Sequence, residues 1–299
     1  MNRLGIDVGG TKIALRLEYA DSATGEIRTR EVVRRWSEPA TLDTDLATLA
    51  EAVAAVADPV VPVASVGVAM PATLDRDGRV RGWPNRPFWQ GLDLAEVLAE
   101  LLPGAAVRTA DDGDLAALAE ADAAGCRDLV HIGVGTGIGG GVVLDGRISP
   151  GTARGSCEVG HLIVDRAGER CDCGRRGCVQ SVASGRAVLR RASACRGRVV
   201  GFDELRTAWL ESQPWAVKTV TESADAVATA AVGLCELMHP QLVTVGGGFA
   251  AGVSGYVDEV ARRAKELSRP AGPEVRVVPA LLGGASSLDG AVLLARAER

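Results

Sequence analysis

The 299-residue sequence predicts an α/β protein built from two related domains. Short apolar segments typical of strands alternate along the whole chain with segments of helical periodicity, and this alternation indicates the α/β class. A strand–glycine turn–strand unit near Gly5 recurs near residue 130, which indicates an internal duplication around a central cleft. The length is ample for two cores, because domains of 100–200 residues are usual.

The first part of the chain is predicted to begin with an antiparallel group of strands. A glycine turn joins the first two strands, and Leu46, Leu49, Val53 and Val56 then follow at helical spacing. Asp114 is a suitable N-cap for an alanine-rich helix. We expect strands over residues 4–8, 12–19, 31–36, 60–69 and 107–110, and helices over 46–57, 92–102 and 115–124.

The second part repeats the opening pattern and then becomes richer in helices. A strand runs into a glycine loop over residues 135–141, and a second strand follows the loop. We expect strands over residues 129–134, 142–144, 241–245 and 275–278, and helices over 184–195, 202–210, 223–238, 256–267 and 287–297. The pattern predicts a small domain over residues 1–113, joined by a C-terminal helix over 286–299, and a large domain over 114–285.

Composition and charge exclude several classes of protein. The formal net charge is −5 and no basic run occurs, so a nucleic-acid partner is not expected. No apolar run approaches the roughly 18 residues that a membrane helix needs, so no membrane association is expected. The first ten residues lead directly into a strand and a glycine turn rather than a signal peptide, which predicts a cytoplasmic protein.

Three glycine-rich loops follow predicted strands. Glycines let backbone N–H groups approach a phosphate without interference from Cβ atoms, and Asp7 at a strand end could hold Mg²⁺ through water. Three unrelated hairpin turns would be the alternative interpretation. The expected ATP phosphate contacts are Asp7, Gly9, Gly10, Thr11 and Lys12 in the first loop, Gly135, Thr136, Gly137 and Gly139 in the second, and Gly247 and Gly248 in the third. Phosphate binding on hairpin turns in two duplicated halves resembles the actin-like ATPase and sugar-kinase (ribonuclease H-like) architecture.

Three of the seven cysteines are bunched in a segment rich in glycine and arginine. Cys171, Cys173 and Cys178, together with His161, would complete a tetrahedral shell for a structural Zn²⁺ ion. Reduced cysteines in a packed core would be the alternative, but the polar surroundings do not favour such a core.

The joint occurrence of DVGGTK, GTGIGGG, ExGH and CxCGxxGC resembles the ROK family, in particular its bacterial glucokinase branch. The resemblance covers essentially the whole chain. It implies an ATP- and Mg²⁺-dependent sugar kinase that assembles as a dimer or tetramer, with domain closure over the sugar. Family repressors carry a DNA-binding domain before the first glycine loop, and here that loop begins within ten residues of Met1.

The resemblance also implies individual roles. Asp111-Asp112-Gly113-Asp114 matches the family motif Asn-Asp-Ala-Asn, in which the aspartate, here Asp112, is the general base for the sugar 6-hydroxyl. Glu158 and His161 correspond to sugar contacts, and His161 is also a zinc ligand. Asn85 resembles a family turn near the sugar, although it could be only a turn residue.

Two departures from the family pattern concern the substrate. The first Asn of the catalytic motif is Asp111, and the family motif GCLE reads GCVQ, which places Gln180 where a sugar-binding glutamate is expected. A carboxylate only accepts hydrogen bonds, so Asp111 suits an ammonium group at C3 of the sugar. The leading hypothesis is therefore a 6-kinase for 3-amino-3-deoxy-D-glucose (kanosamine) that serves antibiotic biosynthesis. A plain glucokinase in which Asp111 satisfies Arg108 or a backbone group, a C7-cyclitol kinase, and a non-catalytic sugar-binding regulator are the alternatives.

Overall fold

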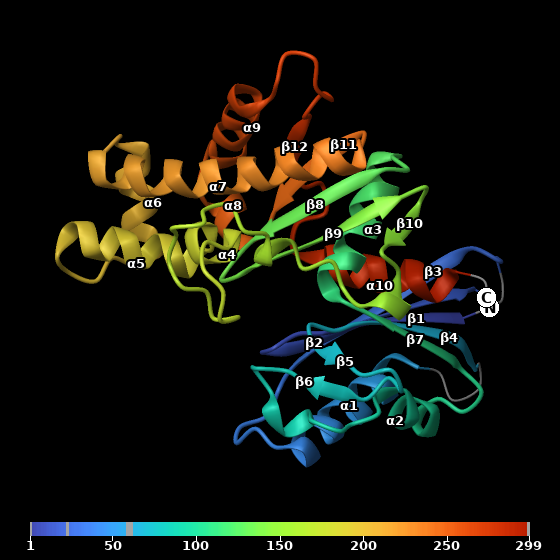
Figure 1. Ribbon diagram of the computed structural model, residues 1–299. Coiled ribbons are helices and arrows are strands. Elements are labelled where there is room, and N and C mark those ends of the chain that lie inside the picture. The colour runs from blue at the N-terminus through green and yellow to red at the C-terminus, as the bar shows by residue number, and fades with distance from the viewer. Residues whose placement is uncertain (1, 22–23, 58–61, 298–299) are drawn as a thin grey trace. The chain divides into compact units, whose positions relative to one another are not determined.

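The computed structural model describes residues 2–21, 24–57 and 62–297, which form two compact units. Unit 1 comprises Met1–Ala119, Pro150–Ser156 and Ala285–Arg299, and unit 2 comprises Glu120–Ser149 and Cys157–Gly284. Each unit has a five-stranded sheet with its own aliphatic core, and helices pack against each sheet (Figure 1).

The sheet of unit 1 has the strand order β3-β2-β1-β4-β7. Its strands are β1 (Asn2–Val8), β2 (Lys12–Ala20), β3 (Ile27–Arg35), β4 (Val63–Ala69) and β7 (Ala106–Ala110). The first three are antiparallel, as the glycine turn predicts, whereas β1, β4 and β7 run parallel. Because parallel strands end at the same edge of a sheet, the segments that follow β1 and β7 emerge at the same edge, with β4 between the two strands.

The C-terminal helix α10 (Ser286–Arg296) packs on the sheet of unit 1 through glycines. A Cβ atom added at Gly67 would lie 2.0 Å from the carbonyl oxygen of Ala291, so only glycine permits this close approach. Ser65 Oγ donates to the carbonyl of Ala295 at 2.7 Å. The remaining elements that lie wholly in unit 1 are α1 (Leu42–Val56), α2 (Leu94–Leu101), β5 (Thr73–Leu74) and β6 (Val80–Gly82).

The sheet of unit 2 has the order β10-β9-β8-β11-β12 and repeats the topology of unit 1. The antiparallel strands are β8 (Leu129–Val134), β9 (Ile138–Leu144) and β10 (Arg147–Ser149), and β11 (Leu242–Gly246) and β12 (Val277–Pro279) run parallel to β8. The internal duplication predicted from the sequence is therefore confirmed by strand order and strand direction.

Helices of unit 2 surround the long, alanine-rich helix α7 (Pro214–Met238), whose inner face is buried. Its small side chains let neighbouring helices approach closely, which agrees with a composition of only 3% aromatic residues. The other helices are α4 (Val179–Ala183), α5 (Gly185–Arg196), α6 (Phe202–Leu210), α8 (Gly248–Gly252) and α9 (Tyr256–Leu267). Helix α3 (Asp112–Ala124) starts in unit 1 and continues into unit 2.

Several sequence-based boundaries were wrong. Strand β3 begins at Ile27 rather than at residue 31, and α1 begins at Leu42 rather than at residue 46. Helix α3 begins at Asp112 rather than Leu115, and Asp114 lies buried inside it rather than capping it. Helix α7 begins at Pro214, nine residues before the predicted start, because proline fits the first turn of a helix. The expected strand over 60–69 starts at Val63 as β4, and positions 60 and 61 lie outside the described residues.

The second glycine loop is also shorter than predicted, because its last three glycines belong to β9. Gly139, Gly140 and Gly141 pair with Gly133, Ile132 and His131 of β8. A Cβ atom at Gly140 would lie 2.2 Å from the carbonyl oxygen of His131, so this glycine serves strand packing. The loop itself is confined to residues 135–137.

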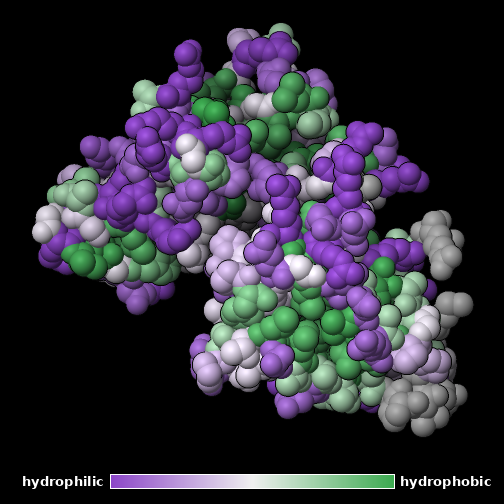
Figure 2. All heavy atoms as spheres, turned by 60° about the horizontal axis from the view of Figure 1, so that its bottom comes forward, coloured by the Kyte–Doolittle hydropathy of each residue, from purple (hydrophilic) through white to green (hydrophobic). Residues whose placement is uncertain are grey.

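Hydrophilic and hydrophobic side chains are interspersed on the face of each unit that Figure 2 displays. Within residues 2–21, 24–57 and 62–297, we find no helix that combines the length and the apolar character needed to cross a lipid bilayer.

Candidate active site and metal centre

Two carboxylates from distant parts of the sequence meet in unit 1. Asp7 is the penultimate residue of β1, and Asp112 begins α3 directly after β7. Burial and the negative charge of Asp112 raise the pKa of Asp7 to about 6, and the positive charge of Lys12 opposes this rise. The two acidic groups predicted for metal binding and proton transfer are thus close enough to interact electrostatically.

The first glycine loop turns tightly between β1 and β2. The N–H of Gly9 donates to the carbonyl of Lys12 at 3.0 Å, and Thr11 and Lys12 are exposed. Asn85 lies against this turn, since a Cβ atom at Gly10 would come within 2.8 Å of the Asn85 Nδ2 atom. The structure therefore brings Asn85 to the first glycine loop of its own unit.

Asp111 caps the helix that carries the proposed base. Its Oδ1 atom accepts a hydrogen bond from the N–H of Gly113 at 3.0 Å, and its carbonyl accepts from the N–H of Leu115 at 3.0 Å. Arg108 donates instead to the carbonyls of Leu294 and Ala297, at 3.4 and 2.7 Å. Asp111 thus has the role that the sequence analysis gave to Asp114, and it fixes the start of α3.

The other two glycine loops lie at one edge of the sheet in unit 2. The N–H of Gly135 donates to the carbonyl of Gly137 at 2.9 Å, a turn one residue tighter than the one that Gly9 closes with Lys12. Gly247 has a φ of 89° and packs on the end of β8, where a Cβ atom would lie 2.6 Å from the carbonyl oxygen of Val134. Thr136 and Gly248 are exposed.

Gln180 lies at the second glycine loop. Its Oε1 atom accepts a hydrogen bond from the N–H of Ile138 at 3.1 Å, and a Cβ atom at Gly137 would come within 3.1 Å of the same oxygen. The sequence analysis placed Gln180 at the sugar, and that contact stays a prediction. The geometry gives this side chain a second task, which is to hold the loop that follows β8.

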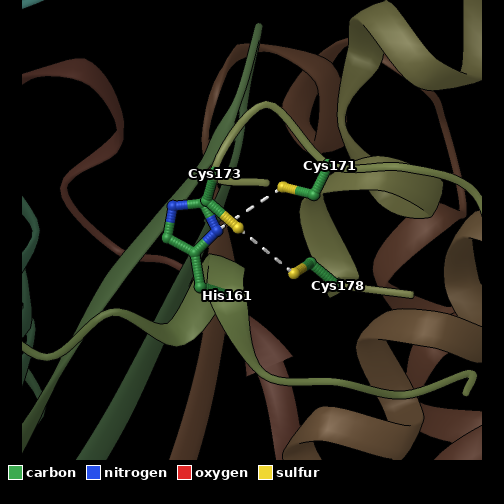
Figure 3. Close-up of side chains that lie close together, drawn as sticks. All are labelled: His161, Cys171, Cys173 and Cys178. Carbon is green, nitrogen blue, oxygen red and sulfur yellow. Dashed lines mark hydrogen bonds between the residues drawn. The ribbon is translucent and has the colours of Figure 1, made fainter. Parts of the chain in front are cut away.

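The predicted zinc ligands converge in unit 2. The ligand atoms of His161, Cys171, Cys173 and Cys178 all lie within 4.8 Å of one another, and Figure 3 shows the four side chains pointing toward a common centre. His161 Nδ1 lies 3.6 Å from Cys171 Sγ, and the sulfur atoms of Cys173 and Cys178 are 3.7 Å apart. A tetrahedral shell with Zn–S of about 2.3 Å and Zn–N of about 2.0 Å has edges of roughly 3.5–3.8 Å, so the donor set fits zinc.

The thiols of this cluster have unequal proton affinities. The backbone N–H of Arg175 lowers the pKa of Cys173 to about 6, whereas burial raises the pKa of Cys178 to about 12. Binding of a divalent cation would therefore displace a proton from Cys178. Glu158 is exposed and lies beside the metal cluster, with its Oε2 atom 4.0 Å from His161 Nε2.

One group of residues near the first loop was missed by the sequence analysis. From the segment WPNRPFW only Asn85 was selected, yet the Nη2 atom of Arg86 donates to the carbonyl of Gly10 at 3.3 Å. Arg86 is 4% exposed. The available signal was an arginine placed among two prolines and three aromatic residues, a context in which a charge is buried and needs a partner.

The duplicated units, each with a glycine turn after its first strand, define an actin-like ATPase fold of the kind found in sugar kinases. The ROK family model matches residues 3–298, and the chain belongs to the ROK family.

Characterised relatives and solved structures agree with this assignment. The chain is 50% identical over 293 residues to the kanosamine kinase of Amycolatopsis mediterranei, covering 98% of this chain and 95% of the relative. The ROK hexokinase of Thermus thermophilus is 32% identical with a TM-score of 0.87, covering 99% and 98% of the two chains. A ROK family glucokinase from Streptomyces griseus, solved with glucose and AMPPNP, is 27% identical with a TM-score of 0.76 and 99% coverage of both chains.

The position of Gln180 leads to a structural prediction. Gln180→Met keeps the length of the side chain but removes the acceptor for the N–H of Ile138, and an unsatisfied buried donor costs about 1–3 kcal/mol. We expect faster hydrogen exchange at Ile138 and a lower midpoint of unfolding. Gln90→Met, at an exposed glutamine of unit 1, is the matched control. Unchanged protection at Ile138 in the Gln180 variant would contradict the described contact.

Proposed function

We propose that the protein is an ATP-dependent kinase that phosphorylates the 6-hydroxyl of a glucose-like hexose. The observation that carries the proposal is the pairing of Asp7 with Asp112 next to the first glycine loop. Phosphoryl transfer needs a positioned base, a cation and N–H donors for the phosphates, and this edge of unit 1 offers residues for each. The kinase names of the characterised relatives support the same reaction class.

In the proposed mechanism, Asp112 accepts the proton of the sugar 6-hydroxyl as the oxygen attacks the γ-phosphate of ATP. The loop residues Gly9, Gly10, Thr11 and Lys12 donate to the phosphates. Asp7 is the residue that would hold Mg²⁺, and the cation would neutralise charge on the phosphoryl group. In unit 2, the exposed loop residues Thr136 and Gly248, together with Gly135, Gly137, Gly139 and Gly247, are the further phosphate contacts that we propose.

For the substrate we propose 3-amino-3-deoxy-D-glucose. Asp111 stands where the family has an asparagine, and its ionised carboxylate would accept from an ammonium group at C3. The 50% identity to a kanosamine kinase supports this choice. Glucose is the second candidate, because the Streptomyces griseus relative is a glucokinase. A C7-cyclitol is the third, and Gln180 in place of the family glutamate is the feature that favours it.

We propose that His161, Cys171, Cys173 and Cys178 hold a structural Zn²⁺ ion. The four protein ligands complete the shell, so the ion would shape the sugar-binding segment rather than activate water. Glu158 and His161 would contact the sugar from this segment, and Asn85 and Gln180 are the other proposed sugar contacts.

Three further features belong to the proposal. A homo-oligomer, dimer or tetramer, follows from the family resemblance. The use of ATP and the seven free cysteines support a reducing, cytoplasmic location. A role in antibiotic biosynthesis rests on the amino-sugar substrate.

Removal of the proposed base is the first test. Asp112→Asn keeps the size of the side chain but cannot accept the proton, so we expect kcat to fall by roughly 10²–10⁴-fold in a coupled assay of ADP release. Asp122→Asn, at an exposed position of the same helix, should leave kcat unchanged. Near-normal turnover of a folded Asp112 variant would contradict the role of Asp112 as the general base.

Substrate choice tests the role of Asp111. A hydrogen bond between charged groups contributes about 1.5–3 kcal/mol, so kcat/KM should favour kanosamine over glucose by roughly ten- to a hundredfold near neutral pH. Asp111→Asn should remove most of this preference. If glucose equals or exceeds kanosamine with the unmodified enzyme, glucokinase becomes the better description.

Zinc content tests the metal centre. We expect one zinc ion per chain by elemental analysis, and Cys178→Ser should lose the ion together with several degrees of thermal stability, because structural zinc contributes directly to folding. Cys195→Ser, at an exposed cysteine, is the control and should keep both properties. Full occupancy in the Cys178 variant would contradict the assignment.

The elevated pKa of Asp7 predicts a pH effect that depends on Mg²⁺. Asp7 has a pKa of about 6, so below that pH it becomes neutral and loses its attraction for the cation. We expect kcat/KM at limiting Mg²⁺ to fall as the pH drops through about 6. Saturating Mg²⁺ should move this fall to lower pH, because the cation competes with the proton. If the fall of kcat/KM at low pH does not respond to Mg²⁺, the titrating group is a residue other than Asp7.

A further inference from the structure

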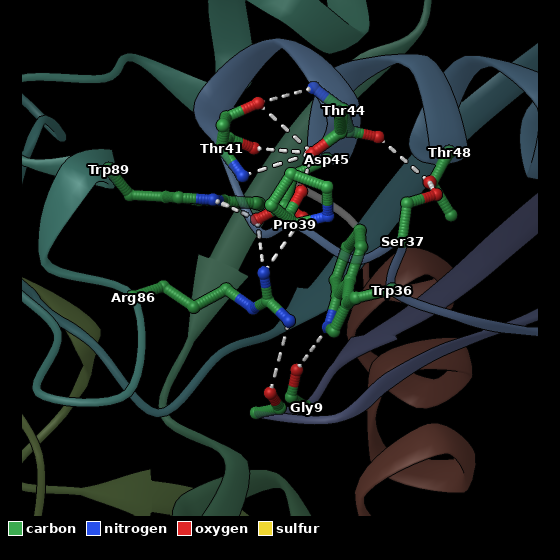
Figure 4. A network of polar contacts seen from close by, with 11 residues as sticks. Gly9, Trp36, Ser37, Pro39, Thr41, Thr44, Asp45, Thr48, Arg86 and Trp89 are labelled. Atoms are coloured by element: carbon green, nitrogen blue, oxygen red, sulfur yellow. Dashed lines mark hydrogen bonds and ion pairs between the residues drawn. The ribbon is translucent and has the colours of Figure 1, made fainter.

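A buried polar cluster lies directly behind the first glycine loop and has no part in the mechanism described so far. It consists of Trp36, Asp45, Arg86 and Trp89, which Figure 4 shows beside the backbone of Gly9. Asp45 is fully buried and Arg86 is 4% exposed. A buried ion pair contributes little net stability compared with an apolar pair of similar size, so its presence beside a loop calls for a specific explanation.

Asp45 fixes the orientation of the Arg86 guanidinium. Arg86 Nη1 lies 2.8 and 2.7 Å from the two carboxylate oxygens of Asp45, and Trp89 Nε1 donates to the same carboxylate at 2.8 Å. The guanidinium carbon lies 4.9 Å from the ring centroid of Trp36, a cation–π distance. These contacts hold the guanidinium with Nη2 directed at the carbonyl of Gly10, 3.3 Å away.

The cluster holds consecutive carbonyl groups of the loop on one side. Trp36 Nε1 donates to the carbonyl of Gly9 at 2.7 Å, Arg86 Nη2 donates to that of Gly10, and the backbone N–H of Trp36 donates to that of Thr11 at 3.3 Å. Every one of these donors lies in unit 1. The carbonyl oxygens of the loop are thus held by hydrogen bonds from Trp36 and Arg86.

This arrangement determines where the N–H groups point. In a planar trans peptide the carbonyl and the next N–H are directed to opposite sides. Holding the carbonyls of Gly9 and Gly10 inward therefore turns the N–H groups of Gly10 and Thr11 outward. Within the described part of the chain, we find no hydrogen-bond acceptor for these two N–H groups.

We infer that Trp36 and Arg86 are positioning residues that orient the N–H groups of Gly10 and Thr11 for the phosphates of the nucleotide, and that Asp45 maintains the orientation of Arg86. The inference rests on the proposed nucleotide binding at this loop and extends it to residues behind the loop. A glycine-rich turn alone is mobile in its peptide orientation, since glycine permits both signs of φ. Preorganised donors avoid that cost when the anion binds.

Trp36→Phe is the sharpest test, because it keeps an aromatic ring below Arg86 and deletes only the donor to Gly9. Trp83→Phe is the matched control, since Trp83 Nε1 is buried without a partner and its ring packs against Trp89 in the same cluster. We expect weaker binding of MgADP by about 2- to 13-fold in the Trp36 variant, which corresponds to the 0.5–1.5 kcal/mol of one hydrogen bond. The Trp83 variant should bind as the unmodified protein does.

A comparison of affinities for nucleotide and sugar distinguishes a positioning role of Trp36 from a general loss of structure. We expect calorimetric titration with MgADP and, separately, with glucose and kanosamine to show that the Trp36 variant loses affinity for the nucleotide alone. Likewise, KM should rise for ATP and stay unchanged for the sugar. Arg86→Lys is the second variant, because lysine can pair with Asp45 but lacks the second planar nitrogen that reaches Gly10. The Arg86 variant should also lose affinity for MgADP and keep its affinity for the sugars. It therefore tests the inference if the Trp36 variant is unstable.

The outcomes also distinguish this inference from the proposed function. If the unmodified protein binds MgADP but phosphorylates no hexose, the proposed reaction fails while the effect of Trp36→Phe on MgADP still tests the inference. Equal MgADP affinity in the folded Trp36 and Arg86 variants and the unmodified protein overturns the inference and leaves the kinase proposal standing. Absence of nucleotide binding in the unmodified protein overturns both.

Discussion

The repulsion between two carboxylates next to the first glycine turn is the constraint on which the proposed site depends. Asp7 and Asp112 lie close together at the end of a parallel sheet, where burial weakens the screening of their charges and raises the pKa of Asp7 to about 6. A protein that folded for stability alone would gain little from this arrangement. A cation bound beside Asp7 would relieve the repulsion, and it would favour the ionised form of Asp112 that the proposed base needs.

The fold repeats the framework of this site by duplication. In each unit a hairpin of antiparallel strands is followed by two parallel strands, so that the glycine turn and the ends of the parallel strands share one edge. In unit 1 this edge collects acidic residues, whereas in unit 2 it collects glycine loops packed on Val134 and held by Gln180. Unit 1 thus places carboxylates beside its glycine turn, whereas the corresponding edge of unit 2 carries two glycine loops.

The sequence was most informative where a local rule applies. Glycine turns after β-branched strands, the spacing of the CxC and GC cysteines, and alanine-rich helices are short-range patterns, and the structure contains all of them, although the starts of α3 and α7 differ from those expected. The failures have two different causes. The start of α3 depends on whether Asp111 or Asp114 caps the helix, and the position of Gln180 and the burial of Arg86 depend on segments about 40 residues or more away. The last two depend on tertiary contacts, which no window of sequence contains, whereas the start of α3 is a local choice between two aspartates that both suit an N-cap.

The choice between an amino sugar and a neutral hexose depends on how the negative charge of the carboxylates that follow β1 and β7 is balanced. Asp111 adds a third carboxylate to the neighbourhood of Asp7 and Asp112, and the family pattern has a neutral amide there. One oxygen of Asp111 accepts from the N–H of Gly113, a contact that an asparagine could also make, so helix capping alone does not require the charge. The helix dipole also favours a negative charge at this position, so the carboxylate is compatible with the cap. A substrate that carries an ammonium group would place an opposite charge beside Asp111 and Asp112, whereas a neutral hexose would not, and the carboxylate at position 111 is therefore the feature of this chain that favours an amino sugar.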